Sequence, residues 1–159
     1  RESLDEWPSR VVQQLDRLQP WVLAQQQRLG VEPAATCLGG FSQGAVLSLE
    51  LVARNDGMAG RVLAFGGRFV ELPAVAPRHT TLHFFHGQDD DVFAVDGLRQ
   101  TMDHLAALQG DATVDIAQGV GHVVHPALIE RALFRLRNHI PQRTWQAALG
   151  AVPAGRDAD

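Results

Sequence analysis

Short apolar segments alternate with amphipathic helical segments along almost the whole chain. Four segments have the length and composition of β-strands, and they cover residues 34–39, 61–65, 81–85 and 112–117. Between them, apolar residues recur at three- and four-residue steps, which is typical of helices that pack on one side. This alternation predicts an α/β fold with a mainly parallel sheet covered by helices on both faces.

Proline and glycine residues indicate where the helical segments begin, bend or end. The first runs from Leu4 to a stop at Gly30, and Pro20 should kink or split it. Later helices are expected over 45–53, 98–108 and 128–140, with a short one around Trp145. We expect one domain over residues 1–151 and a flexible tail over 152–159. The first three strands are continuously apolar and should be central, whereas 112–117 alternates with polar residues and should lie at an edge.

Composition excludes several classes of partner. The 159 residues carry 14 basic and 18 acidic side chains, a formal net charge of −4, with no basic block that would suit nucleic acid. No apolar run approaches the ~20 residues of a membrane span, and the start lacks the pattern of a secretory signal. The single cysteine, Cys37, cannot form an internal disulfide, so we expect a cytoplasmic location, with Cys37 as buried filler.

The pentapeptide Gly40-Phe41-Ser42-Gln43-Gly44 joins the first strand to the following helix. A G-x-S-x-G at such a junction is typical of a sharp, strained turn that holds a nucleophilic serine beyond the end of the sheet. Side chains two residues before and after the serine should collide, so we expect glycine to be required at both positions. The alternative is a glycine-rich turn with an ordinary serine.

Three groups that could act together follow strand ends. Ser42 follows the first strand, the acids at 89–91 follow the third, and His122 follows the fourth. Their chain order, Ser, Asp, His, suits a hydrolase in which histidine activates serine and a carboxylate orients the histidine. The residues alone leave two alternatives: His122 could be a surface loop histidine, and any of the three acids could be a solvated or capping residue.

Three motifs together resemble the carboxylesterase/phospholipase family of small serine hydrolases, which includes acyl-protein thioesterases and bacterial carboxylesterases. The motifs are Gly40–Ala45, His86–Val92 and Gly121–His122. The resemblance extends from about Leu4 to the final long helix. Within the family, the chain resembles the bacterial esterases most. It implies the α/β-hydrolase fold and ester hydrolysis without a cofactor.

The resemblance also assigns roles residue by residue. The family's G-F-S-Q-G places the nucleophile at Ser42, its H-G-x-x-D-x-V places the acid at Asp90, and its G-H places the base at His122. Asp89 and Asp91 are then the solvated or capping acids. The residue after the nucleophile, Gln43, would supply one amide of the oxyanion hole.

One departure from the family concerns the amino-terminal side. The family has further strands before the first helix, and an early H-G loop there supplies the second oxyanion amide. No such segment precedes Ser42 in these residues. We therefore expect the amino-terminal strands to be missing and the chain to be the carboxyl-terminal part of the full fold. Its activity alone is then in question, and one edge of the sheet should be exposed.

The predicted function is a serine hydrolase that cleaves carboxylic esters of small-molecule or lipid-like substrates. The alternatives are an acyl-protein thioesterase or lysophospholipase, which differ in leaving group and acyl length, and a non-catalytic fragment of the hydrolase fold. Dienelactone hydrolases use a cysteine nucleophile, so Ser42 speaks against them. The sequence leaves the oligomeric state open, with a homodimer as one option.

Apolar and histidine side chains near the motifs are less informative. Phe41, Phe69 and Val92 could bind substrate as part of an acyl pocket, as could Phe65, with core packing as the alternative at each position. No metal site is expected: His122 and His125 share a three-residue spacing, but no cysteine or paired carboxylate completes a ligand set.

Overall fold

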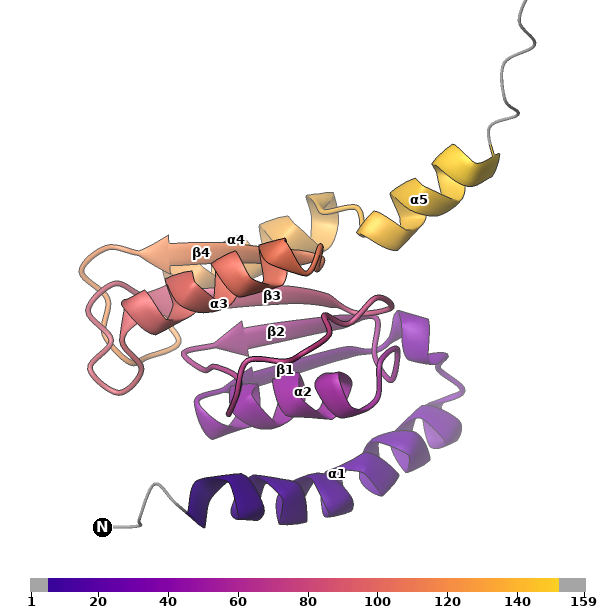
Figure 1. The fold of residues 1–159 in the computed structure, drawn as a ribbon, viewed down its shortest axis with the longest axis horizontal. Helices are drawn as coiled ribbons and strands as arrows, with labels where there is room; N and C mark the ends of the chain where they lie inside the picture. The colour runs from indigo at the N-terminus through magenta and orange to yellow at the C-terminus, as the bar shows by residue number, and fades with distance from the viewer. Residues whose placement is uncertain (1–5, 152–159) are drawn as a thin grey trace, which may run out of the picture.

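Four parallel strands form a sheet whose spatial order follows the chain, β1-β2-β3-β4 (Figure 1). The computed structural model describes residues 6–151, so Leu4 and the expected tail lie outside the described residues. The strands are β1 (Cys37–Phe41), β2 (Arg61–Phe65), β3 (Thr81–Gly87) and β4 (Ala112–Ala117). Every neighbouring pair is parallel, as the alternation predicted, and β4 lies at an edge.

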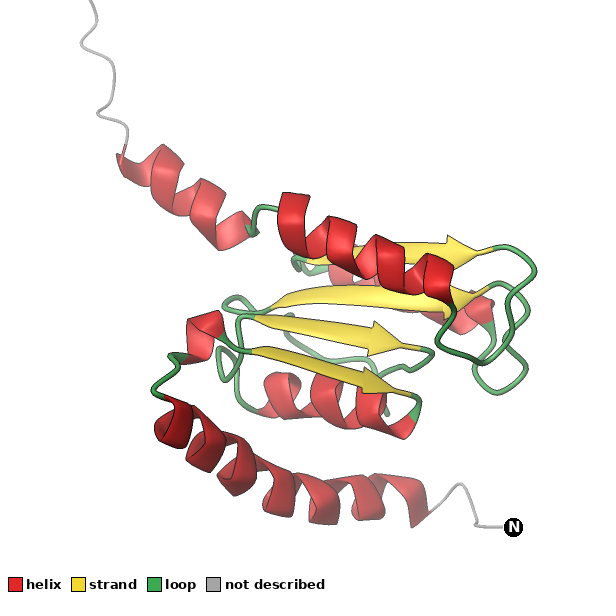
Figure 2. Ribbon diagram, turned by 180° about the vertical axis from the view of Figure 1, so that it is seen from behind, coloured by secondary structure: helices red, strands yellow, loops and turns green. Residues whose placement is uncertain are grey.

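The helices cover both faces of this sheet (Figures 1 and 2). In chain order they are α1 (Trp7–Leu29), α2 (Gln43–Arg54), α3 (Val95–Ala107), α4 (Pro126–Asn138) and α5 (Gln142–Ala151). α2 and α3 lie on one face, α4 lies on the other, α1 packs beside α2, and α5 points away from the sheet. A loop over 66–80 connects β2 to β3 without a helix.

The start of the first strand differs from the expectation, and the first helix is not split. The first strand starts at Cys37 rather than at residue 34, because Pro33 opens the short 3₁₀ turn η2 (Pro33–Ala35). Pro20 does not split the first helix: α1 is continuous through it and curves along its length (Figure 1). Gly30 ends α1 in the left-handed conformation, with φ 63°, as a glycine stop should.

The core lies on both sides of β2 and β3, the central strands. Towards α2 and α3, Val62 and Phe84 pack with Leu49 and Leu105. Towards α4, Phe85 packs with Leu128 and Ala132. Because β3 is buried along its whole length, it is the rigid centre from which the functional loops extend.

β1 is the second edge of the sheet, and its burial differs from the expectation for a central strand. Its residues alternate between exposed and half-buried, and Cys37 is exposed. The prediction that Cys37 is buried filler is therefore wrong for this chain. The physical reason is that alternate side chains of β1 point to the sheet face opposite α2, where α4 packs on β3 and β4 and leaves this strand uncovered.

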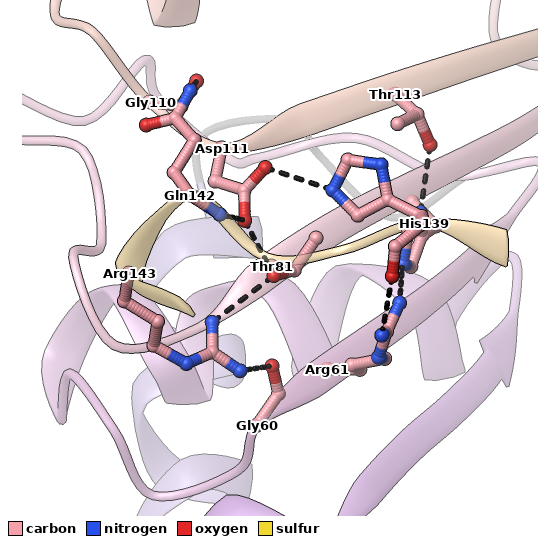
Figure 3. A network of polar contacts seen from close by, with 10 residues as sticks. Gly60, Arg61, Thr81, Gly110, Asp111, Thr113, His139, Gln142 and Arg143 are labelled. Atoms are coloured by element: carbon pink, nitrogen blue, oxygen red, sulfur yellow. Dashed lines mark hydrogen bonds and ion pairs between the residues drawn. The ribbon is translucent and has the colours of Figure 1, made fainter. Parts of the chain in front are cut away.

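A polar network at the amino-terminal ends of the strands attaches the α4–α5 connection to the sheet (Figure 3). The carboxylate of Asp111, which is 7% exposed, accepts three hydrogen bonds. The donors are Thr81 Oγ1 at 2.6 Å, His139 Nε2 at 3.0 Å and the backbone amide of Gln142 at 3.1 Å. Arg143 also donates to Thr81 Oγ1, at 3.0 Å. These bonds satisfy a buried carboxylate that would otherwise be costly.

His83 of β3 belongs to the same network and is fully buried. Its Nε2 lies 2.9 Å from Arg61 Nη1, and its Nδ1 lies 2.7 Å from Thr113 Oγ1. Since a guanidinium only donates, Nε2 accepts and carries no hydrogen, so the ring is neutral. Burial, together with the positive charge of Arg61 and the nearby His139, lowers the pKa of His83 to about 4.

We expect acid to destabilise the fold through His83. Its folded pKa of about 4 is below the roughly 6.5 of an unfolded histidine. Between these pH values the unfolded chain binds a proton that the folded chain does not, so the free energy of unfolding falls as pH decreases, by about 3 kcal/mol at most. When the free energy of unfolding, measured with denaturant, is plotted against pH over this range, the slope should be shallower for His83→Gln than for the wild type. Equal pH slopes in the two proteins would contradict the assignment.

Candidate active site

Ser42 occupies a strained turn between β1 and α2. Its backbone has φ 56° and ψ −113°, a region that residues other than glycine rarely adopt. The Ser42 amide donates to the Phe65 carbonyl at 2.9 Å, and the Ser42 carbonyl accepts from the Val46 amide at 3.0 Å. The turn is therefore tied to β2 on one side and to the first turn of α2 on the other, which fixes the position of the hydroxyl.

The glycines around this turn have unequal roles. A Cβ at Gly40 would overlap the Gly44 carbonyl and lie 2.6 Å from the Ala45 amide, so glycine is required there. A Cβ at Gly44 would meet no described atom within 4 Å. The expected collision is thus right for Gly40 and wrong for Gly44. Gly67 has a requirement that the pattern did not indicate, because a Cβ there would overlap Ala45 Cβ.

His122 lies between Ser42 and Asp90. Its Nε2 is 3.0 Å from Ser42 Oγ, and its Nδ1 is 2.8 Å from Asp90 Oδ2. The Asp90 side chain is fully buried, and the His122 side chain is 16% exposed. The structure therefore brings together the three residues that the sequence selected from three different strand ends.

Asp90 is held by more than the histidine. Its Oδ1 accepts the Val92 amide at 2.9 Å and the Phe93 amide at 2.8 Å. Burial raises the pKa of Asp90, but the bonds from His122 and from these amides outweigh it, so the pKa lies below its usual value. Asp89 and Asp91, by contrast, are exposed.

Close backbone contact places the two loops that carry Asp90 and His122 side by side. The Gln88 amide donates to the Ala117 carbonyl and the Asp89 amide to the Val120 carbonyl, each at 2.9 Å. A Cβ at Gly87 would overlap the Val120 carbonyl, so only glycine permits this approach. Gly87, the last residue of β3, therefore allows Asp90 to approach His122.

Two aromatic rings flank the His122 imidazole. The ring of Phe41, which is 40% exposed, lies 4.8 Å from it, and the ring of Phe93 meets it edge-on at 5.9 Å. The Arg68 guanidinium lies 5.3 Å from the Phe93 ring. Sequence reasoning missed Phe93, whose position three residues after the acid was the available signal.

The apolar residues expected near the substrate separate into two groups. Phe41, at the end of β1, and Val92, in the loop after Asp90, are both exposed. Phe69 is 4% exposed and packs on Phe84 at a ring distance of 6.3 Å, while Phe65 stacks on Phe85 at 4.8 Å. The burial of Phe69 and the stacking of Phe65 favour the core-packing role that the sequence left open for both.

A cavity of about 230 Å³ lies between α1 and α2, and Gln43, next to Ser42, contributes to its wall. Gln43 is the first residue of α2, and its amide is among the first four of the helix, which have no acceptor within the helix. The wall combines apolar with polar side chains: Trp7, Arg10, Val11, Gln14, Gln43, Val46 and Leu47.

Within residues 6–151, no three His, Cys, Asp or Glu side chains lie close enough together to hold a metal ion. His125, which shares a three-residue spacing with His122, instead accepts a hydrogen bond from the Ala127 amide at the start of α4. In the same part of the chain, no helix has the length and apolar character needed to cross a bilayer.

A serine at a strained strand-to-helix turn, with a histidine and an aspartate at later strand ends of a parallel sheet, defines an α/β-hydrolase. The fold prediction is thereby confirmed. A sequence model of the phospholipase/carboxylesterase family matches residues 8–140, and the chain belongs to that family.

Individual relatives agree with this placement. The chain is 38% identical over 132 residues to Esterase YpfH of Escherichia coli K12, covering 83% of this chain and 57% of that protein. It is 26% identical over 122 residues to Acyl-protein thioesterase 1 of Gibberella zeae, covering 72% and 52%. The crystal structure of esterase PE8 superposes with a TM-score of 0.78 at 27% identity, covering 88% of this chain and 66% of that one. The chain thus spans little more than half the length of these curated relatives.

Proposed function

We propose that this chain carries the catalytic triad of a carboxylic ester hydrolase, with Ser42 as nucleophile. The observation that carries the proposal is the alignment of Ser42 Oγ, the His122 ring and the Asp90 carboxylate, through contacts of 3.0 and 2.8 Å. These are hydrogen-bond distances suited to proton transfer.

The ionised state of Asp90 sets the direction of this transfer. Its pKa is lowered, so the carboxylate is charged near neutral pH and accepts the hydrogen on His122 Nδ1. The Nε2 of the neutral ring is then free to accept the Ser42 proton. A buried negative charge beside the ring also stabilises the imidazolium that results.

The reaction follows in two halves. As Ser42 Oγ attacks the ester carbonyl, its proton moves to His122 Nε2 and the carbonyl electrons move to oxygen. The Gln43 amide, at the positive end of α2, donates to this oxyanion. When the intermediate collapses, His122 gives the proton to the leaving alcohol and the acyl group stays on Ser42. Water then repeats the sequence and releases the acid.

The substrate we propose is a small-molecule or lipid-like ester, and no cofactor is involved. Phe41 and Val92 are exposed apolar residues close in the chain to Ser42 and Asp90, and we propose that they contact the acyl group. One curated relative is named as an esterase and another as an acyl-protein thioesterase, so a thioester is the second candidate. The cytoplasm is the compartment we propose.

A complete oxyanion hole needs a second donor. Because the chain spans little more than half of its curated relatives, we propose that residues of the full-length gene product outside this chain supply it. Losing one donor typically lowers the rate by roughly 10²–10³. The alternative, a fragment that binds without turnover, predicts no covalent chemistry at Ser42.

Labelling with a fluorophosphonate probe tests the proposal. The full-length gene product should form one adduct, located at Ser42 by peptide mass spectrometry, and should hydrolyse p-nitrophenyl esters. A series of acyl lengths plus one thioester defines the preference. The 159-residue chain, run in parallel, reports what the second donor contributes. An intact protein whose Ser42 stays unlabelled would refute the esterase assignment.

A further inference from the structure

We infer that His86 is a positioning residue for the acid of the triad, an inference that rests on the proposed function. His86 lies in β3, four residues before Asp90, and is 2% exposed. It touches neither Ser42 nor His122 through a hydrogen bond among the described contacts. Its influence on the reaction would therefore pass through the turn over residues 90–93.

The hydrogen bonds of His86 fix its tautomer. Its Nε2 lies 2.6 Å from the Phe93 carbonyl oxygen and 3.4 Å from Asp90 Oδ2. Since a carbonyl oxygen can only accept, Nε2 carries the hydrogen and donates it. The His86 N–H, on a fully buried strand, thus holds the Phe93 carbonyl at the end of the turn that carries Asp90. The Asp90 carboxylate lies farther from the same N–H.

Phe93 links this bond to both Asp90 and His122. Its amide donates to Asp90 Oδ1 at 2.8 Å, while its carbonyl accepts from His86. Its ring meets the edge of the His122 imidazole at 5.9 Å. Holding Phe93 therefore orients the carboxylate and limits the movement of the imidazole together. Small displacements of such groups reduce turnover strongly.

A purely structural role for His86 makes a different prediction. A cavity of about 90 Å³ adjoins His86, Phe93 and Leu98. If His86 served only as packing there, its replacement would lower the melting temperature and leave the turnover of each folded site unchanged. Turnover per active site and folding stability therefore have to be measured separately.

Three variants of the full-length gene product separate the two roles. His86→Leu removes the donor but fills the space. His86→Asn keeps an amide, but one too short to reach the Phe93 carbonyl. His86→Gln places an amide N–H near the position of Nε2. The fluorophosphonate probe counts active sites, so kcat refers to competent enzyme only.

We expect kcat to fall by roughly 10- to 100-fold in the Leu and Asn variants, with KM nearly unchanged, and to recover in the Gln variant. The low-field proton resonance of His122 Nδ1–H should persist in the wild type and in His86→Gln and should shift or broaden in the other two. If Leu does not fold, the Asn and Gln pair gives the same comparison. Equal kcat per site in all variants of a labelled, active wild type would overturn this inference alone. A wild type that is neither labelled nor active would remove the proposed function as well.

Discussion

Replacing Ser42 with alanine should lower kcat/KM for a p-nitrophenyl ester by roughly 10⁴-fold or more and abolish fluorophosphonate labelling. The variant loses the only atom that can carry the acyl group in the proposed reaction. His122→Ala should produce a similar loss, because Ser42 Oγ then has no base at 3.0 Å. The two losses should not add in the double variant, since the residues act as a unit.

Matched controls exist within a few residues of each position. Ser48, on α2, donates to the Gly44 carbonyl at 2.8 Å, and Ser48→Ala should keep most of the activity. His125 lies three residues after His122, and its side chain accepts from the Ala127 amide at the start of α4, so His125→Ala should also keep most of the activity. Turnover in Ser42→Ala comparable to these controls would exclude Ser42 as the nucleophile.

Replacing Asp90 with asparagine should reduce kcat by roughly 10⁴-fold. The amide keeps the shape of the side chain, but its nitrogen cannot accept the hydrogen of His122 Nδ1. The histidine then favours the tautomer with hydrogen on Nε2, which cannot take the Ser42 proton. Asp90 also accepts the Val92 and Phe93 amides through Oδ1, so the substitution could change folding stability as well as catalysis. The melting temperature of each variant should therefore be measured together with its kinetics.

The neighbouring acids provide the control for this prediction. Asp89 and Asp91 are exposed, so Asp89→Asn and Asp91→Asn should stay within a few-fold of the wild type, as surface substitutions usually do. Steady-state kinetics of the three variants, with active sites counted by the probe, give a direct ranking. Equal activity in all three would refute the assignment of Asp90.

Much of the fold and site could be predicted because the responsible features are local. Apolar runs and helical spacing indicate strands and helices wherever one face is buried, and Ser42, Asp90 and His122 each follow a strand end. The start of β1 differs from the expectation because Ala34 and Ala35 are apolar enough to resemble a strand. Their 3₁₀ turn depends on backbone geometry that hydrophobicity does not report.

What the sequence did not reveal depends on which neighbour a side chain meets. A buried phenylalanine in the core and one beside the active site have the same pattern, so Phe69 and Phe93 could not be told apart. The role of Gly67 depends on α2, which is distant in the chain and packs against it through Ala45. The hydrogen bond from His86 to the Phe93 carbonyl likewise appears only once the turn is folded.

The positive φ of Ser42 has a consequence for the evolution and engineering of this protein. A non-glycine residue in such a conformation stores strain on the order of 1–3 kcal/mol, and glycine at position 42 would relieve it. Selection for stability alone would therefore favour glycine at position 42, whereas the nucleophilic role that we propose requires serine there. If the proposed role is correct, position 42 is one at which gains in stability and gains in activity oppose each other.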